Sequence, residues 1–316
     1  MNITSGALLT DLYELTMAQA YLAQGMTDIA VFEFFVRKLP PQRNFFMAAG
    51  LEQVLSYLEA FQFSDADIAW LDQTGGFSPV SLNALRAMRF TGEVHAMPEG
   101  SLFFPHEPIL RITAPLPQAQ LVETRVMNLL NFQTMVASKA CRSVLVAGNK
   151  PLIDFGLRRA HGAEAGLLAA RAAYLAGLAG TSNVSAGARF GIPIYGTMAH
   201  SFVQAHLDEA KAFIHIAETQ PRNVVFLIDT YDTEAAAEKV VSLAGRLKAR
   251  GISIHGVRLD SGDLADHARK VRHILDRGGL TATQILASGN LDEERIQTLV
   301  TGQAPIDSFA IGTAMA

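Results

Sequence analysis

The second part of the chain alternates short apolar runs with amphipathic stretches of helical length, and this alternation constrains the fold more than any other feature. The apolar runs are 151–155, 178–182, 193–196, 224–229, 254–260, 284–288 and 308–312. Stretches such as 233–250 and 263–277 separate them. Short strands that alternate with helices predict a parallel sheet. Seven units in succession favour a closed or nearly closed α/β barrel over an open sheet.

Residues 1–135 follow a different pattern, which predicts a mixed α+β domain. The expected elements are a helix at 10–24, a strand at 29–36, a helix at 51–61, two or three short strands within 92–113 and a long helical stretch over 117–147. Thr10 or Asp11 is the expected N-cap of the first helix, and Gly25 its stop. We therefore expect two domains, 1–135 and 136–316, with the parallel α/β barrel second.

Composition excludes several classes of protein. Hydrophobic residues make up 49% of the chain and charged residues 18%, which is unlike a disordered protein. The net charge of -4 leaves no basic excess to neutralise a nucleic-acid backbone. The single cysteine, Cys141, cannot form an internal disulfide or a multi-thiolate zinc site. The first basic residue is Arg37, and no stretch has the composition of a membrane span. We expect a cytoplasmic protein that binds neither nucleic acid nor membranes.

Polar, charged and glycine residues follow every apolar run. The clusters are 154–159, 180–183, 196–200, 229–232, 258–263, 288–290 and 312–313. Active sites of parallel α/β barrels lie at the carboxyl ends of the strands, so these clusters are expected to meet at one end of the barrel. One such cluster is a weak signal, but seven together predict a site for a small molecule.

The last two clusters suggest a phosphate cradle made of Ser288, Gly289, Asn290, Gly312 and Thr313. Barrel enzymes often bind phosphate in the loops after their last strands. A helix expected to begin near Leu291 would present free backbone N–H groups and a favourable dipole to an anion. An ordinary turn followed by a helix cap is the alternative.

Charged side chains gather at the same ends: Arg158, Arg159, Arg258, Asp229, Asp232, Asp260 and Asp263. The arginines suit phosphate or carboxylate, although surface ion pairs would also explain them. Carboxylates beside phosphates suit Mg²⁺, and pairing with the arginines is the alternative for at least two of them. His200 suits an acid/base or nucleophilic role, because His206 lies at a spacing unsuited to shared zinc ligation; a buried structural histidine is the alternative.

Four segments together resemble the nicotinate phosphoribosyltransferase family, a type II phosphoribosyltransferase family. They are LLTDLYELTM at 8–17, DFGLR at 154–158, GTMAHSF at 196–202 and RLDSGD at 258–263. The resemblance runs in order from residue 6 to 314. It implies an irregular parallel α/β barrel with an N-terminal α+β domain. The implied activity joins nicotinate to phosphoribosyl pyrophosphate, giving nicotinate mononucleotide and diphosphate as the first step of NAD salvage from nicotinate.

The resemblance also implies cofactors, partners and residue roles. ATP would be a co-substrate, coupled through phosphorylation of His200, with Mg²⁺ present. A homodimer would share its active sites, so that Tyr13 of one subunit and Phe155 of the other stack on the two faces of nicotinate. Thr197 and Arg258 would contact nicotinate, with Arg258 facing its carboxylate.

The remaining roles concern phosphoribosyl pyrophosphate. The resemblance implies that Arg158 lies near its pyrophosphate and that Asp260 and Asp263 order Mg²⁺ and ribose. The 5′-phosphate would lie in the cradle of Ser288, Gly289, Asn290, Gly312 and Thr313.

Ser182 bears on the choice of substrate. The related nicotinamide phosphoribosyltransferase resembles this chain at the same motifs but has an aspartate where Ser182 stands. An aspartate accepts a hydrogen bond from an amide and repels a carboxylate, whereas a serine is neutral and can donate. A mismatch of this kind is worth ~1–3 kcal/mol, which favours nicotinate over nicotinamide. Quinolinate phosphoribosyltransferase fits less well, because it lacks the histidine of 196–200 and the ATP coupling.

The family normally continues well past the cradle, whereas this chain stops at Ala316. We expect exposed apolar surface, or dependence on a partner chain, where a returning C-terminal segment would pack. A truncated, non-catalytic remnant that binds ligand or dimerises through the helix of Tyr13 is therefore the alternative to an active enzyme.

Overall fold

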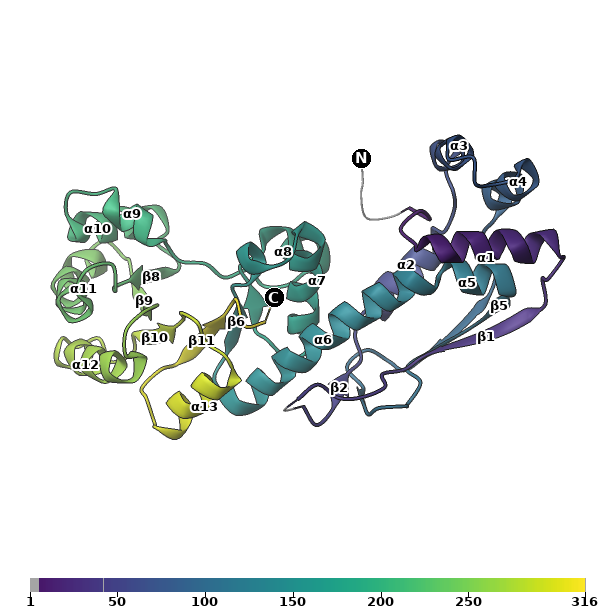
Figure 1. Cartoon of the computed structure of the whole chain (residues 1–316). Helices are drawn as coiled ribbons and strands as arrows, with labels where there is room; N and C mark the ends of the chain where they lie inside the picture. The colour runs from purple at the N-terminus through teal and green to yellow at the C-terminus, as the bar shows by residue number, and fades with distance from the viewer. Residues whose placement is uncertain (1–5, 42, 316) are drawn as a thin grey trace. The chain divides into compact units, whose positions relative to one another are not determined.

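The computed structural model describes residues 6–41 and 43–315. The chain divides into two compact units, 1–138 and 139–316 (Figure 1). None of the helices in the described ranges is both long enough and apolar enough to cross a membrane.

Unit 1 is mixed α+β. Its elements are α1 Leu12–Ala23, β1 Ile29–Phe34, β2 Phe46–Met47, α2 Leu51–Glu59, α3 Asp65–Gln73, α4 Pro79–Ala87, β3 Glu93–Ala96, β4 Leu102–Phe103, β5 Leu110–Pro115, α5 Leu116–Leu121 and the first part of α6 Glu123–Ala147. Strands β1, β5 and β3 form an antiparallel sheet with β5 in the centre, and β2 pairs with β4. The expected elements are confirmed, with the last helical stretch divided at Val122.

Unit 2 contains the parallel sheet. Its elements are the end of α6, β6 Leu152–Asp154, η1 Leu157–Arg159, α7 Ala163–Leu175, β7 Gly180–Thr181, α8 Val184–Phe190, α9 His200–Gln204, α10 Glu209–Thr219, β8 Val224–Leu227, α11 Thr233–Lys248, β9 Ile254–Leu259, α12 Leu264–Arg277, β10 Gln284–Ala287, α13 Glu293–Thr301 and β11 Ser308–Ile311. The strand order is β7-β6-β11-β10-β9-β8, and every pair is parallel.

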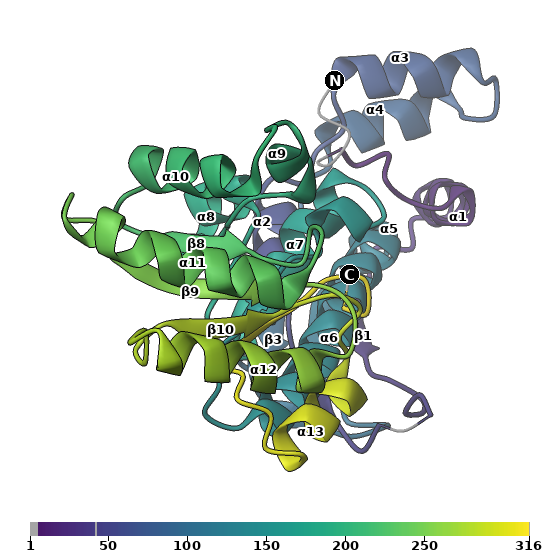
Figure 2. The same ribbon diagram turned by 90° about the vertical axis from the view of Figure 1, so that its left-hand side faces the viewer.

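The sheet curls into half a barrel, and helices α10, α11 and α12 lie along one face of β8, β9 and β10 (Figure 2). Strands β6, β10 and β11 are largely buried, because helices and neighbouring strands cover them. Burial on both faces explains why these strands appear in the sequence as continuous apolar runs. The irregular parallel α/β class is confirmed, but the described strands form an open half-barrel and not the closed or nearly closed barrel expected from the sequence.

One of the seven expected strands does not form. Run 193–196 makes a single isolated bridge, Thr181↔Ile194, beside the edge strand β7. Pro193 has no N–H to donate, and Gly196 stands two residues after Ile194, so both ends of this short run disfavour a longer ladder. Among the described residues the sheet therefore has six strands, with β7 and β8 at its edges.

Candidate active site

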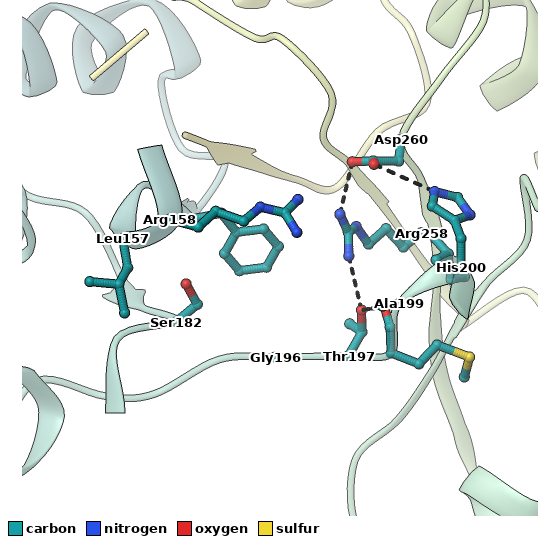
Figure 3. Close-up of a pocket in the computed structure, with 12 residues that line it drawn as sticks. Leu157, Arg158, Ser182, Gly196, Thr197, Ala199, His200, Arg258 and Asp260 are labelled. Atoms are coloured by element: carbon teal, nitrogen blue, oxygen red, sulfur yellow. Dashed lines mark hydrogen bonds and ion pairs between the residues drawn. The ribbon is translucent and has the colours of Figure 1, made fainter. Parts of the chain in front are cut away.

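A cavity of about 330 Å³ lies at the carboxyl ends of the strands of unit 2, and we call it the histidine cavity (Figure 3). Its lining contains seven predicted site residues: Phe155, Arg158, Ser182, Thr197, His200, Arg258 and Asp260. Leu157, Met198 and Leu227 add apolar surface to it. Segments that follow β6, β7 and β9 thus meet around one space, as expected for a parallel sheet.

A second cavity of about 240 Å³ lies beside the first, and we call it the glycine cavity. Its lining contains the five predicted cradle residues Ser288, Gly289, Asn290, Gly312 and Thr313. The two cavities share Phe155, Arg158, Arg258 and Asp260. A ligand with two chemically different ends could therefore occupy both at once.

Arg258 joins the walls of the two cavities. Its Nη1 donates to Oγ1 of Thr197 at 3.3 Å, its Nη2 to Oδ1 of Asp260 at 2.8 Å and its Nε to Oγ of Ser288 at 2.8 Å. The guanidinium carbon lies 5.2 Å from the ring centroid of Phe155, which is a cation–π distance. These three hydrogen bonds leave two of the five guanidinium N–H groups for a ligand.

Asp260 is held as a carboxylate. Its Oδ1 accepts hydrogen bonds from Ser288 at 2.5 Å and from Arg258 at 2.8 Å. Burial alone would raise the pKa of Asp260, but the Ser288 hydrogen bond and the Arg258 charge outweigh burial and lower that pKa below its usual value. Its Oδ2 faces the ring of His200, 3.7 Å from Nε2.

His200 stands at the first position of α9, after the extended residue Ala199. Its Nδ1 lies 3.2 Å from the hydroxyl oxygen of Thr230, and its side chain is 39% exposed toward the cavity. His206 belongs to a different environment, because it bonds the carbonyl of Phe202 and the ring of His215. Within residues 6–41 and 43–315, no group of three or more His, Cys, Asp or Glu side chains is arranged to hold a metal ion.

The floor of the glycine cavity requires glycine at one position. Gly289 has φ +91°, and a Cβ there would lie 1.9 Å from the carbonyl oxygen of Asp260. Asn290 also has a positive φ, +50°, which asparagine tolerates better than most residues. The loop after β10 can therefore pass directly over the backbone of Asp260 only with a glycine at 289.

The helix beside this loop begins later than expected. Its first residue is Glu293, not a residue near Leu291, because Asp292 caps it by accepting from the backbone N–H of Arg295 at 2.8 Å. Glu293 in the first turn lies 2.6 Å from Nζ of Lys139. A capped helix with acidic residues in its first turn favours an anion less than a free N-terminus does, so the expected contribution of the helix dipole to the cradle stays a prediction.

Two further arginines supply positive charge at the glycine cavity. Arg158 lines both cavities, and Arg159 lines the glycine cavity. Both side chains are exposed, and neither makes a hydrogen bond or an ion pair with another residue of the described part of the chain. Their charges are therefore available to an anionic ligand.

The four carboxylates of the predicted magnesium region differ in their contacts. Asp263 caps α12 through the backbone N–H groups of Ala265 and Asp266, both at 3.1 Å. Asp232 caps α11 in the same way. Oδ2 of Asp229 supports the next loop by accepting from the backbone N–H of Asp260 at 3.0 Å. Of the four, only Asp260 lines either cavity.

Tyr13 belongs to α1 in unit 1, and its side chain is exposed. Its hydroxyl donates to Oε1 of Glu123 at 3.1 Å. Partial desolvation of the phenol, together with the negative charges of Glu123 and Glu14, raises the pKa of Tyr13 to about 12. The phenol therefore stays protonated at neutral pH, and its predicted contact with a partner subunit stays a prediction.

Three further side chains of the polar clusters support the site, although the sequence alone assigns them no role. Thr230 contacts His200, and the buried pair Asp154 and Thr181 lies at the ends of β6 and β7. The sequence does carry a signal for Asp154, because an acidic residue within a buried apolar run must find hydrogen-bond donors.

Comparisons with known proteins give a consistent result. The sequence model of the nicotinate phosphoribosyltransferase N-terminal domain matches residues 8–131, and that of the nicotinate phosphoribosyltransferase family matches residues 151–316. The chain is 50% identical over 310 residues to nicotinate phosphoribosyltransferase pncB2 of Mycobacterium tuberculosis, covering 98% of this chain and 66% of that protein. It is 43% identical over 311 residues to nicotinate phosphoribosyltransferase of Bacillus subtilis, covering 98% and 63%.

The crystal structure of human nicotinic acid phosphoribosyltransferase superposes with a TM-score of 0.89 at 33% identity, covering 96% of this chain and 72% of that one. The chain thus spans just under two thirds of the length of these two bacterial relatives.

Proposed function

Because this chain belongs to the nicotinate phosphoribosyltransferase family, we propose that it transfers the phosphoribosyl group of phosphoribosyl pyrophosphate to nicotinate, in the first step of NAD salvage from nicotinate. The products are nicotinate mononucleotide and diphosphate. The observation that carries the proposal is the pair of adjoining cavities with four shared residues, one cavity with an aromatic wall and the other with glycines and free arginines. A pyridine ring and a ribose phosphate need these two environments side by side.

Nicotinate occupies the histidine cavity in this proposal. Its ring lies against Phe155, and its carboxylate accepts from the two guanidinium N–H groups of Arg258 that the protein leaves unused. Thr197 fixes one end of that guanidinium. Ser182 lines the same cavity with a neutral hydroxyl, which tolerates a carboxylate where an aspartate would repel it.

The reaction breaks the bond between the anomeric carbon and diphosphate. Positive charge then develops on the ribose ring and negative charge on the leaving group. Arg158 lines both cavities and stabilises the leaving charge, and the ionised Asp260 faces the developing positive charge. The pyridine nitrogen is already nucleophilic, so the chain must orient the ring but need not supply a base.

Mg²⁺ fits this arrangement when the substrate supplies most of its ligands. Asp260 keeps one carboxylate oxygen turned toward the histidine cavity, whereas Asp263 uses its carboxylate for the cap of α12. The ion would neutralise charge on diphosphate. One carboxylate with several substrate oxygens and waters is a common way for proteins to hold it.

His200 is proposed as the residue that couples ATP hydrolysis, with release of ADP and phosphate. Its ring is exposed to the cavity, and Thr230 orients it. A phosphoryl group on the imidazole would place negative charge beside Asp260 and Arg258 and would change which ligands the cavity holds. This role frees the histidine from acid/base chemistry, which the reaction does not need.

A homodimer with shared sites completes the proposal. The exposed Tyr13 on α1 would cover the face of nicotinate opposite Phe155 in the partner subunit. A protonated phenol suits this position, because a phenolate would repel the carboxylate of the substrate.

Product formation by the purified chain tests the proposal. Nicotinate, phosphoribosyl pyrophosphate and Mg²⁺ are supplied with and without ATP, and nicotinamide is run in parallel. We expect nicotinate mononucleotide, formed faster with ATP and faster than the nicotinamide product. A folded chain that makes no product but binds nicotinate would instead be the non-catalytic remnant. A preference for nicotinamide would make it the related nicotinamide enzyme.

A further inference from the structure

Asp154 and Thr181 are buried polar residues behind the histidine cavity, and neither contributes to its lining. Asp154 is 2% exposed and Thr181 is fully buried. They stand opposite each other in the register of β6 and β7, at the carboxyl ends of both strands. A buried carboxyl group and a buried hydroxyl group destabilise a fold unless their hydrogen bonds are satisfied, so their partners are informative.

Asp154 binds the loops on both sides of the cavity. Its Oδ1 accepts from the backbone N–H of Gly156 at 2.7 Å, which fixes the turn immediately after Phe155. Its backbone carbonyl accepts from the N–H of Ser182 at 2.8 Å. Its Oδ2 accepts from the hydroxyl of Thr181 at 2.7 Å. One residue therefore sets the positions of Phe155 and Ser182 relative to each other.

Thr181 extends these contacts to a third loop. Its hydroxyl oxygen accepts from the backbone N–H of Asn183 at 2.9 Å. Its own N–H donates to the carbonyl of Pro193 at 3.0 Å, and its carbonyl accepts from the N–H of Tyr195 at 2.9 Å. The segment that leads into Thr197 is thereby held against β7. Each polar atom of the Thr181 backbone and side chain has a partner.

Three loops that carry predicted nicotinate contacts thus converge on two residues that do not touch the cavity. We propose that Asp154 and Thr181 are positioning residues for the pyridine ring, because they set the spacing of Phe155, Ser182 and Thr197. This inference rests on the proposed function. It deepens that function by assigning ring recognition to a hydrogen-bonded pair behind the cavity wall.

The decisive variant is Thr181→Val, which keeps the shape of the side chain and removes its hydroxyl. Oδ2 of Asp154 and the N–H of Asn183 then lose their shared partner. We expect the Kd for nicotinate, measured by calorimetry, to rise about tenfold. The KM for nicotinate rises equally. The KM for phosphoribosyl pyrophosphate and kcat stay within about threefold, because the hydroxyl of Thr181 bonds no residue that lines the glycine cavity. Thr181→Ser restores the hydroxyl and the affinity.

Thr283→Val is the matched control. Thr283 is also buried, at 3% exposure, and its hydroxyl bonds the carbonyl of Ile254 at 3.4 Å at the other end of the sheet. This variant lowers the melting temperature and leaves the Kd for nicotinate unchanged. If Thr181→Val does not fold, Asp154→Asn takes its place, because the amide keeps the size of the side chain and loses one of its two acceptors.

Two results separate this inference from the proposed function. If the folded Thr181→Val chain binds nicotinate like the unaltered chain and differs from it only in melting temperature, the pair is structural and the inference is overturned. If the unaltered chain shows no heat of nicotinate binding, the proposed function fails, and the inference fails with it.

Discussion

The histidine cavity and the glycine cavity use the same loops for opposite chemistry. In the histidine cavity, Arg258 is already paired with Asp260 and lies over an aromatic ring, so much of its charge is balanced within the protein. The glycine cavity shares these residues and Arg158 but adds Arg159, and the side chains of Arg158 and Arg159 have no partner in the described part of the chain. A balanced wall suits a flat ring with one carboxylate, whereas an unbalanced one suits a phosphate. The difference arises because Asp260 pairs with Arg258, whereas Asp154 bonds Gly156 and Thr181 and leaves Arg158 without a partner.

The glycine cavity differs most from the histidine cavity in one feature: the backbone at Gly289 passes directly over the backbone of Asp260. Gly289→Ala forces a Cβ against the carbonyl of Asp260 at a φ that side chains rarely adopt. We expect kcat/KM for phosphoribosyl pyrophosphate to fall by at least about 100-fold. The matched control is Gly196→Ala in the histidine cavity, where a Cβ meets nothing within 4 Å. Equal losses in the two variants would show that close approach is not the distinguishing property.

The next prediction changes His200, which lines the histidine cavity but not the glycine cavity. His200→Ala removes the proposed phosphoryl acceptor and leaves the three arginines of the glycine cavity, Arg158, Arg159 and Arg258, in place. We expect the stimulation by ATP to disappear, with a loss of about 30-fold in rate, corresponding to ~2 kcal/mol of coupling. Slow product formation without ATP remains. Rates with and without ATP at saturating substrates decide the matter, and unchanged stimulation by ATP would reject the phosphohistidine proposal.

Ser182→Asp adds a second carboxylate to the histidine cavity and leaves the lining of the glycine cavity unchanged. The new charge repels the carboxylate of nicotinate and accepts a hydrogen bond from an amide. We expect the ratio of kcat/KM for nicotinate to that for nicotinamide to fall about tenfold, or ~1.4 kcal/mol. Ser182→Asn, which adds similar volume without charge, is the control. An unaltered ratio in the aspartate variant means that position 182 does not face the substituent of the ring.

The elements that follow from the alternation of apolar runs and helical stretches could be predicted. The elements that depend on a single proline or a single helix cap could not. Strands β6 and β8–β11 appear as apolar runs because they are buried in a parallel sheet. Run 193–196 is shorter and contains a proline and a glycine, and it forms only one isolated bridge. Helices α3 and α4 were missed although Ser64 and Ser78 cap them through backbone N–H groups. Each helix has only a short apolar face, which is a weak sequence signal, and only the two cap residues mark where the helices begin.

The site shows the same division. Polar residues after strands identified the loops of both cavities, because parallel strands bring their ends together. Sequence could not decide which aspartate of 258–263 lines a cavity, since Asp260 and Asp263 are equal in composition. The start of α12 decides it, because the residue that caps a helix must turn its oxygen to the helix N–H groups.

The smallest expected effect concerns Asp263. It tests whether this residue only caps α12 or also binds Mg²⁺. Asp263→Asn keeps an oxygen that can cap α12 and removes the charge, whereas Asp263→Ala removes both. If the cap is the whole role, the asparagine variant keeps its stability and its Mg²⁺ requirement, and the alanine variant loses about 1 kcal/mol of unfolding free energy. Urea unfolding and magnesium titration of activity measure the two quantities. A raised Mg²⁺ requirement in the asparagine variant would return Asp263 to the metal site.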